Sequence, residues 1–224
     1  MDPRETHSPA FKRFRLSFFE DKDFWRNGLD TVALSLLEGE ERMRAEEMLV
    51  GQLPDERGII GLGELRSRRA EPELMRLFEA EREARRRAGH RPDGSWSPFR
   101  LVRLAKALWQ IRPEPAWLAA VTEILADQDI NDMRRLDAAM ALAVFRDPVA
   151  VSTLVQTLDD RHSLVRHHAV RALLIIHGLL DEAGPIQHGP EHMMYRVMSD
   201  DLARREGAKR ELLAAIAERP IAPR

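Results

Sequence analysis

Histidines gather in the last third of the chain, at His162, His167, His168, His177, His188 and His192. Imidazole nitrogens bind metal ions, so this cluster raises the question of a metal site. A helical ligand pair needs side chains at i and i+4 with a carboxylate beside them, and the sequence has no His-Glu-x-x-His motif. His188 and His192 have the right spacing, but Gly189-Pro190 lies between them. We therefore expect surface or partly buried histidines, with no bound metal and no cofactor.

Motifs for nucleophilic catalysis and phosphate binding are absent from the sequence. The chain has no cysteine, which excludes disulfides, thiolate metal ligands and cysteine nucleophiles. It also lacks the Gly-x-Ser-x-Gly elbow and the phosphate-binding Walker loop. Gly61 and Gly63 fall within a helical pattern, so we expect them to permit close helix packing. The sequence predicts no catalytic residue and a protein that is not an enzyme.

Tryptophan side chains could stack on the bases of a nucleic acid. Trp109 and Trp117 fall on apolar repeat positions, however, and we expect both in the core. Trp96 lies in a loop rich in glycine and serine, and we expect it to be exposed. The formal net charge of −2 disfavours a surface built to neutralise phosphates. Nucleic-acid binding is therefore an alternative and not the main expectation.

Charge is distributed unevenly along the chain. Residues 57–103 hold 12 basic and 7 acidic side chains, whereas residues 20–56 hold 4 basic and 11 acidic ones. The basic excess includes a run of arginines at Arg82, Arg85, Arg86 and Arg87. One interpretation is a patch that attracts an anion or an acidic partner. The other is a helix C-terminus whose cations pair with neighbouring glutamates, namely Glu79, Glu81 and Glu83.

The elements that must position these residues are helices. Apolar residues recur at i, i+3, i+4 and i+7, which is the period of an amphipathic helix. Proline and aspartate begin several segments, as at Asp147-Pro148, where both suit a first helical turn. No alternating β-branched stretch indicates a strand. We predict helices over residues 23–37, 40–53, 55–67, 71–88, 98–111, 115–127, 132–146, 148–158, 162–178, 190–199 and 201–218.

Two pairs of helical segments repeat. Residues 135–142 match residues 166–173 at a shift of 31, with an arginine, two alanines and a leucine in common. Residues 115–125 match residues 148–158 at a shift of 33 through their apolar positions. A fainter copy lies upstream, near residues 61–78. A helix pair cannot bury its apolar face alone, so neighbouring pairs must stack.

We therefore expect an all-α fold, an α-solenoid with a right-handed superhelix of about five helix pairs over residues 23–219. An irregular helical bundle is the alternative. Residues 1–22 are expected to be partly disordered or to cap the first repeat with phenylalanines (Phe11, Phe14, Phe18 and Phe19). This segment could instead bind a partner or a membrane surface. The tail at 220–224 is expected to fray.

The run from Asp147-Pro148 to Leu173 resembles the HEAT-repeat family, in particular its bacterial branch similar to the bilin-lyase HEAT-like repeats. The matching elements include Asp159-Asp160, Val165-Arg166 and Ala172-Leu173. This resemblance implies stacked helix pairs, and it implies a protein-binding scaffold more often than an enzyme. The HEAT-like hydroxylases use paired His-Glu dyads, and here Glu191-His192 is reversed and single.

The resemblance also implies that the second helix of each pair lines a concave surface. Candidate partner-binding residues on those helices are Arg76, Glu79, Glu123, Thr153 and Gln156, and the arginine run adds Arg82, Arg85 and Arg86. Arg135 and Arg166 occupy matching positions after aspartate-rich turns, so we expect a partly exposed Asp–Arg ladder between repeats.

These observations predict a non-enzymatic HEAT-repeat scaffold or adaptor that binds a protein partner through its concave or charge-polarised surface. A nucleic-acid-binding HEAT protein, or a HEAT-like enzyme of the bilin-lyase or hydroxylase type, is the alternative. No apolar run approaches the ~18 residues of a membrane span. The polar N-terminus has no signal-peptide pattern, so we expect a cytoplasmic protein.

Overall fold

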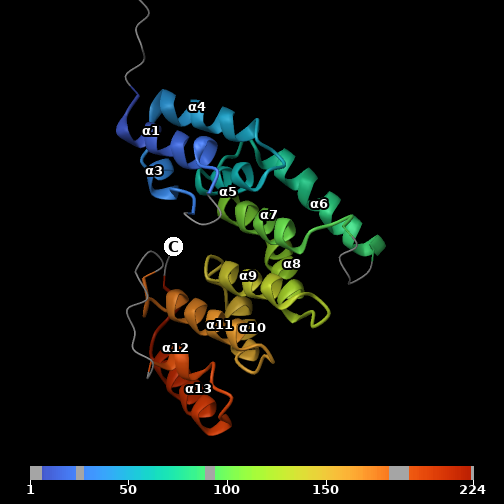
Figure 1. The fold of residues 1–224 in the computed structure, drawn as a ribbon, viewed down its shortest axis with the longest axis vertical. Coiled ribbons are helices and arrows are strands. Elements are labelled where there is room, and N and C mark those ends of the chain that lie inside the picture. Colours follow the sequence, from blue (N-terminus) through green and yellow to red (C-terminus); the bar gives the residue numbers. More distant parts are fainter. Residues whose placement is uncertain (1–6, 24–27, 89–93, 182–191, 223–224) are drawn as a thin grey trace, which may run out of the picture. The chain divides into compact units, whose positions relative to one another are not determined.

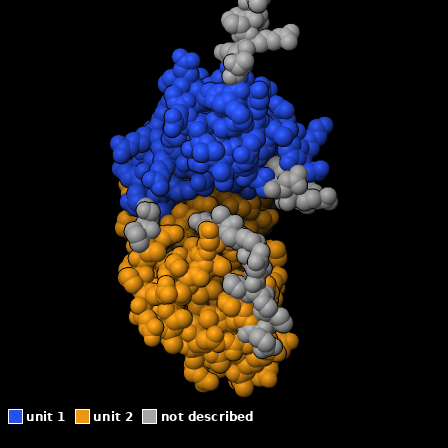
Figure 2. Space-filling model, turned by 90° about the vertical axis from the view of Figure 1, so that its left-hand side faces the viewer, with its two compact units in different colours: residues 1–80, 107–113 blue, residues 81–106, 114–224 orange. Residues whose placement is uncertain are grey.

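The computed structural model of the chain describes residues 7–23, 28–88, 94–181 and 192–222. Within these ranges the chain is all-helical and forms no strand, as the sequence predicts (Figure 1). It divides into two compact units (Figure 2). Unit 1 comprises residues 1–80 and 107–113, and unit 2 comprises residues 81–106 and 114–224. None of the described helices is both long and apolar enough to cross a membrane.

Unit 1 begins with the phenylalanine-rich segment, which forms α1 (Pro9–Arg15) and the π-helical turn η1 (Leu16–Glu20). The guanidinium of Arg57 donates a hydrogen bond to the carbonyl oxygen of Phe18 at 3.1 Å. Three rings of this segment are fully buried, those of Phe11, Phe14 and Phe18. The segment is thus docked within unit 1, which favours the capping interpretation over a free partner-binding segment.

The next helices of unit 1 are α3 (Thr31–Ser35), α4 (Gly39–Val50) and α5 (Glu56–Glu64). The helix predicted over 23–37 is shorter because Asp30 caps it, its side chain accepting a hydrogen bond from the Ala33 N–H at 2.8 Å. Residues 24–27 of that prediction lie outside the described residues. α4 and α5 pack against each other. Their bounds lie close to the predicted ranges of 40–53 and 55–67.

Two glycines set how closely α5 can be approached. A Cβ atom added at Gly61 would lie 2.6 Å from Cδ2 of Leu49. One added at Gly63 would lie 2.8 Å from the backbone Cα of Ala107. Real Cβ atoms do not come this close to other heavy atoms. The prediction that Gly61 and Gly63 permit close packing is therefore confirmed.

Helices α6 (Glu71–Ala88) and α7 (Pro98–Ile111) match their predicted ranges, and each is divided between the two units. Unit 2 continues with α8 (Pro115–Ala126), α9 (Asp132–Leu142), α10 (Pro148–Thr157) and α11 (Ser163–Ile176). α8 packs on α9, and α10 packs on α11. Because α9 also lies beside α11 and α8 beside α10, the four helices form two layers, one of α8 and α10 and one of α9 and α11 (Figure 1).

Unit 2 ends with the short α12 (Met193–Arg196) and with α13 (Leu202–Ala217). The helix predicted over 190–199 is reduced to four residues, and residues 182–191 lie outside the described part. The prediction of a frayed tail is wrong for residues 220–222. The Ala222 N–H donates to the Ile176 carbonyl at 2.8 Å, and Arg146 donates to the Ala222 carbonyl at 3.2 Å. These bonds fasten the tail to the end of α11 and to the turn before α10.

Candidate functional site

The predicted surface residues lie on three helices. Those on α6 are Arg76, Glu79, Arg82, Arg85 and Arg86; α8 carries Glu123, and α10 carries Thr153 and Gln156. Glu79 is exposed and Arg82 is half-buried. Arg76 and Glu79 belong to unit 1, and the others belong to unit 2.

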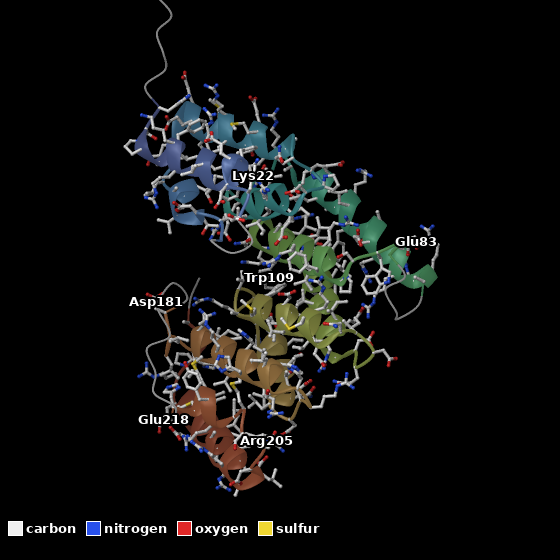
Figure 3. The ribbon with its side chains drawn as sticks, viewed as in Figure 1. Lys22, Glu83, Trp109, Asp181, Arg205 and Glu218 are labelled. Carbon is white, nitrogen blue, oxygen red and sulfur yellow. The ribbon has the colours of Figure 1, made fainter. Side chains whose placement is uncertain are left out.

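Several arginines of α6 are bonded to glutamates of the same helix. Arg76 pairs with Glu73 at 2.6 Å, and this hydrogen bond lowers the pKa of Glu73 and raises the pKa of Arg76. Arg86 and Arg87 both pair with Glu83, at 2.7 and 3.2 Å (Glu83 is labelled in Figure 3). The two Glu83 pairs agree with the interpretation in which helix glutamates balance the arginine run, whereas Glu81 binds Ser97 and Arg100 instead.

The side chain of Arg85 extends from α6 to α8. Its Nη1 donates to Oε2 of Glu123 at 3.0 Å, and its Nη2 donates to Oδ2 of Asp127 at 3.4 Å. Its guanidinium carbon lies 5.5 Å from the ring centroid of Trp96, within cation–π range. The structure therefore brings together two of the predicted residues, Arg85 and Glu123, in a clamp between α6 and α8.

The prediction that Trp96 is exposed is wrong, because only 2% of this residue is exposed. The loop that carries it is held by the buried carboxylate of Glu81. This carboxylate accepts hydrogen bonds from the Ser97 N–H at 2.7 Å and from Nε of Arg100. Arg85 then covers the indole ring. The other two described tryptophans, Trp109 and Trp117, are buried as predicted.

The exposed stripes of α8 and α10 form one surface, which we call the α8/α10 face. On α8 it consists of Ala116, Ala119 and Glu123, and on α10 of Val149, Ser152 and Gln156. The two sets match at the repeat shift of 33 residues. Thr153 is half-buried beside them, and its hydroxyl donates to the Val149 carbonyl at 2.9 Å. Small neutral side chains dominate this face, and the hydroxyl of Ser152 donates to the Val149 carbonyl at 3.0 Å.

Arg135 lies beneath the surface, with 0% of its side chain exposed. It donates to the Leu125 carbonyl at 3.1 Å, to Asp132 at 3.0 Å, and to Asp160, whose side chain is only 4% exposed. Burial lowers the pKa of Arg135, and the hydrogen bond to Asp132 opposes that shift. The predicted Asp–Arg ladder is confirmed here, with Arg135 and Asp160 buried and Asp132 32% exposed.

Arg166 does not form the predicted ladder. Its guanidinium donates to four main-chain carbonyls, those of Asp160, Arg161, Val197 and Met198. The reason is that this guanidinium faces the turn before α11 and the end of α12, where carbonyls lack helical partners. The matched arginines therefore play related structural roles with different acceptors.

The adjacent histidines of α11, His167 and His168, contact neighbouring residues of unit 2. Nδ1 of His167 lies 2.8 Å from the Met194 carbonyl. Burial lowers the pKa of His168 to about 4, and the nearby His167 and Arg171 add to this shift. In the part of the chain that the structure describes, no group of histidine and carboxylate side chains is placed to hold a metal ion. His188 lies outside that part.

A second exposed surface was missed at the level of sequence. Met133 and Met140 stand on α9, and Leu164 stands on the adjacent α11. The signal was available, because Met133 and Leu164 match at the repeat shift of 31 residues on positions that the apolar core does not use. A lone apolar residue on a surface means little, but a matched pair on neighbouring helices marks a candidate interface.

Comparison of the chain with family models, with curated proteins and with solved structures finds no match.

Proposed function

We propose that this chain is a non-enzymatic scaffold of the HEAT-repeat type that binds a protein partner over the α8/α10 face. One observation carries the proposal: matched helix pairs stack so that equivalent exposed positions of α8 and α10 lie on one face. Repetition of this kind produces an extended surface in place of a cavity. Further stacking of the same kind would make the array a solenoid.

The mechanism would be shape complementarity to a surface that is already formed. Ala119 and Ser152 are small, so a partner backbone can approach both helices closely. The buried guanidinium of Arg135 contacts both repeats through Asp132 and Asp160, which limits sliding between them. A rigid surface loses little conformational freedom on binding, and this lowers the cost of association.

The nucleic-acid alternative is disfavoured by the ion pairs of α6. Arg76, Arg86 and Arg87 are bonded to glutamates, and Arg85 is bonded to Glu123 and Asp127. A phosphate would have to displace these carboxylates before it could bind. No observation favours the enzymatic alternative.

Site-specific photo-crosslinking tests the proposal. A photoreactive phenylalanine analogue is placed at Gln156, on the α8/α10 face, or at Ala214, an exposed position of α13 that serves as the matched control. Each protein is irradiated in an extract of the cells that make the chain. We expect a discrete protein adduct from position 156 and none from position 214.

A second step asks whether the same surface is responsible. Ala119→Arg with Ser152→Arg places two large cations on the face without touching the core, and it should abolish the adduct from position 156. Ala214→Arg should leave that adduct unchanged. Equal labelling from both positions, or an adduct that survives the double variant, would contradict the proposal.

A further inference from the structure

A second face of unit 2 combines apolar and cationic side chains on α7, α9 and α11, and we call it the methionine face. Its residues are Phe99 and Arg103 of α7, Met133, Arg134, Asp137 and Met140 of α9, and Leu164, His168 and Arg171 of α11. None of them belongs to the α8/α10 face. This inference is therefore independent of the proposed function.

The apolar part of the methionine face is open to solvent. Met133 is 54% exposed, Met140 is 43% exposed and Leu164 is 37% exposed. Met133 and Met140 stand two helical turns apart, about 10 Å along the axis. Leu164 occupies in α11 the position that Met133 occupies in α9, and the two helices lie side by side. Unbranched methionine adapts to the shape of an apolar partner, which suits it to such a surface.

Cations flank this apolar part. Arg103 and Arg134 lie over the ring of Phe99, 4.6 and 5.0 Å from its centroid. Arg171 stands in α11 at the position that matches Met140 in α9. Phe99 thus fixes two guanidinium groups at one edge, and Arg171 supplies a third on the neighbouring helix.

The carboxylate of Asp137 is the acidic group among these residues, and it lies 3.6 Å from Arg134. Burial raises its pKa, while the charges of Arg103 and Arg134 act in the opposite direction. His168 adds no charge at neutral pH, because burial lowers its pKa to about 4. Among the residues of the methionine face, three guanidinium groups thus stand beside one carboxylate.

We propose that the methionine face docks an acidic amphipathic helix of a partner protein. The apolar side chains of that helix would lie on Met133, Met140 and Leu164, along the line between α9 and α11. Its glutamates or aspartates would flank them and meet Arg103, Arg134 and Arg171. Apolar anchors at i and i+7 on the partner match the spacing of the two methionines, as in other helix-in-groove complexes.

An anionic membrane is the competing occupant, since it too would be attracted by cations beside apolar side chains. The position of Asp137 argues against it. This carboxylate stands between Met133 and Met140, where insertion into lipid would remove it from water. A partner helix can leave a small or polar residue opposite it.

The test uses the full chain and a fluorescent peptide of about 18 residues, or about five helical turns, with leucine at i, i+3, i+4 and i+7 and glutamate elsewhere. A second peptide carries lysine in place of every glutamate. Fluorescence anisotropy should show saturable binding of the acidic peptide alone, weakened by added salt. Vesicles of anionic phospholipid are tested in parallel and should not sediment the chain.

Variants locate the contact. Met133→Glu with Met140→Glu should weaken binding of the acidic peptide at least about tenfold, because it puts two carboxylates in the apolar part. Arg134→Gln with Arg171→Gln should weaken it less and reduce its salt dependence. Met43→Glu, which changes a similarly exposed methionine of α4 outside both faces, is the matched control and should leave it unchanged. Circular dichroism checks that each variant is folded.

Three results would overturn the proposal: no binding of the acidic peptide, equal binding of the lysine peptide, or equal binding by the double methionine variant. Sedimentation with anionic vesicles that the methionine variant abolishes would assign the face to a membrane instead.

Discussion

Unit 1 and unit 2 reach close helix packing by opposite means. In unit 1 the side chain is removed, as at Gly61 and Gly63, so that backbone and small side chains approach directly. In unit 2 a long cationic side chain is inserted, as at Arg135 and Arg166, and its N–H groups bind carbonyls and carboxylates left at helix ends. A contact of the first kind is disrupted when a side chain is added to the glycine. A contact of the second kind is disrupted when the arginine side chain is removed.

The largest effect should come from Arg135→Ala. Its loss leaves the carboxylate of Asp160 buried without its cation, and the Leu125 carbonyl loses a donor. Breaking a buried ion pair from one side costs about 3–5 kcal/mol of the free energy of unfolding. Urea denaturation would measure the loss, and hydrogen exchange should show it in α9 and α11.

A double variant sharpens this result. Arg135→Met with Asp160→Leu removes both charges together, and such replacements are often close to neutral. We expect it to recover most of the stability lost by Arg135→Ala. Arg166→Ala should cost less than Arg135→Ala, because the hydrogen bonds of Arg166 go to neutral main-chain carbonyls, whereas Arg135 binds the buried carboxylate of Asp160. Equal losses of stability in Arg135→Ala and Arg166→Ala would contradict the expected difference between a buried ion pair and hydrogen bonds to carbonyls.

Acid should weaken unit 2 through His168. Its folded pKa of about 4 lies below the usual 6.5 because the half-buried ring is partly desolvated, and because His167 and Arg171 lie nearby. The unfolded chain therefore binds a proton more readily, and stability is lost as the pH falls from about 6.5 towards 4. Linkage gives a loss of about 2–3 kcal/mol from this group across that range.

The difference between the native chain and His168→Gln isolates this contribution, because other groups titrate in both proteins. Between pH 7 and pH 4.5, the urea midpoint of the native chain should fall further than the urea midpoint of His168→Gln. A pH-independent difference would show that His168 is not buried in its neutral form.

Local sequence patterns predicted α8 to α11, α13 and the glycine contacts, because these depend on period and on side-chain size. α6 and α7 were predicted at their observed bounds for the same reason. Trp96 was misplaced because its burial depends on Arg85 and Glu81, which the sequence does not show to be near it. The docked tail depends likewise on Arg146, which lies far from Ala222 along the chain.

Partners of the candidate residues were harder to predict than their helices. The period places Glu123 and Gln156 on matching exposed positions, but it cannot show that Arg85 reaches Glu123. The different acceptors of Arg135 and Arg166 depend on where α12 lies, and the repeat pattern ends before that helix. The match of Met133 with Leu164 is present in the sequence, but the position of Phe99 and Arg103 beside them depends on the arrangement of three helices.

Adding a methyl group should damage unit 1. Gly63→Ala places a Cβ 2.8 Å from the Cα and Cβ atoms of Ala107, which the backbone must move to relieve. Overpacking of this kind costs about 1–3 kcal/mol. Gly61→Ala should cost less, because its nearest neighbours are the methyl groups of Leu49, which can rotate away. Thermal unfolding of the two variants would test this order.

The same methyl group should have the opposite effect at Gly207 in α13. This glycine lies within a helix of unit 2, and a Cβ there would meet nothing within 4 Å. Gly207→Ala should therefore raise the free energy of unfolding by about 0.4–1 kcal/mol, since alanine restricts the unfolded chain and favours the helix. Urea denaturation beside Gly63→Ala makes the pair a matched measurement of one methyl group in two settings. A loss of stability at Gly207 would mean that α13 is packed more tightly than its open surroundings indicate.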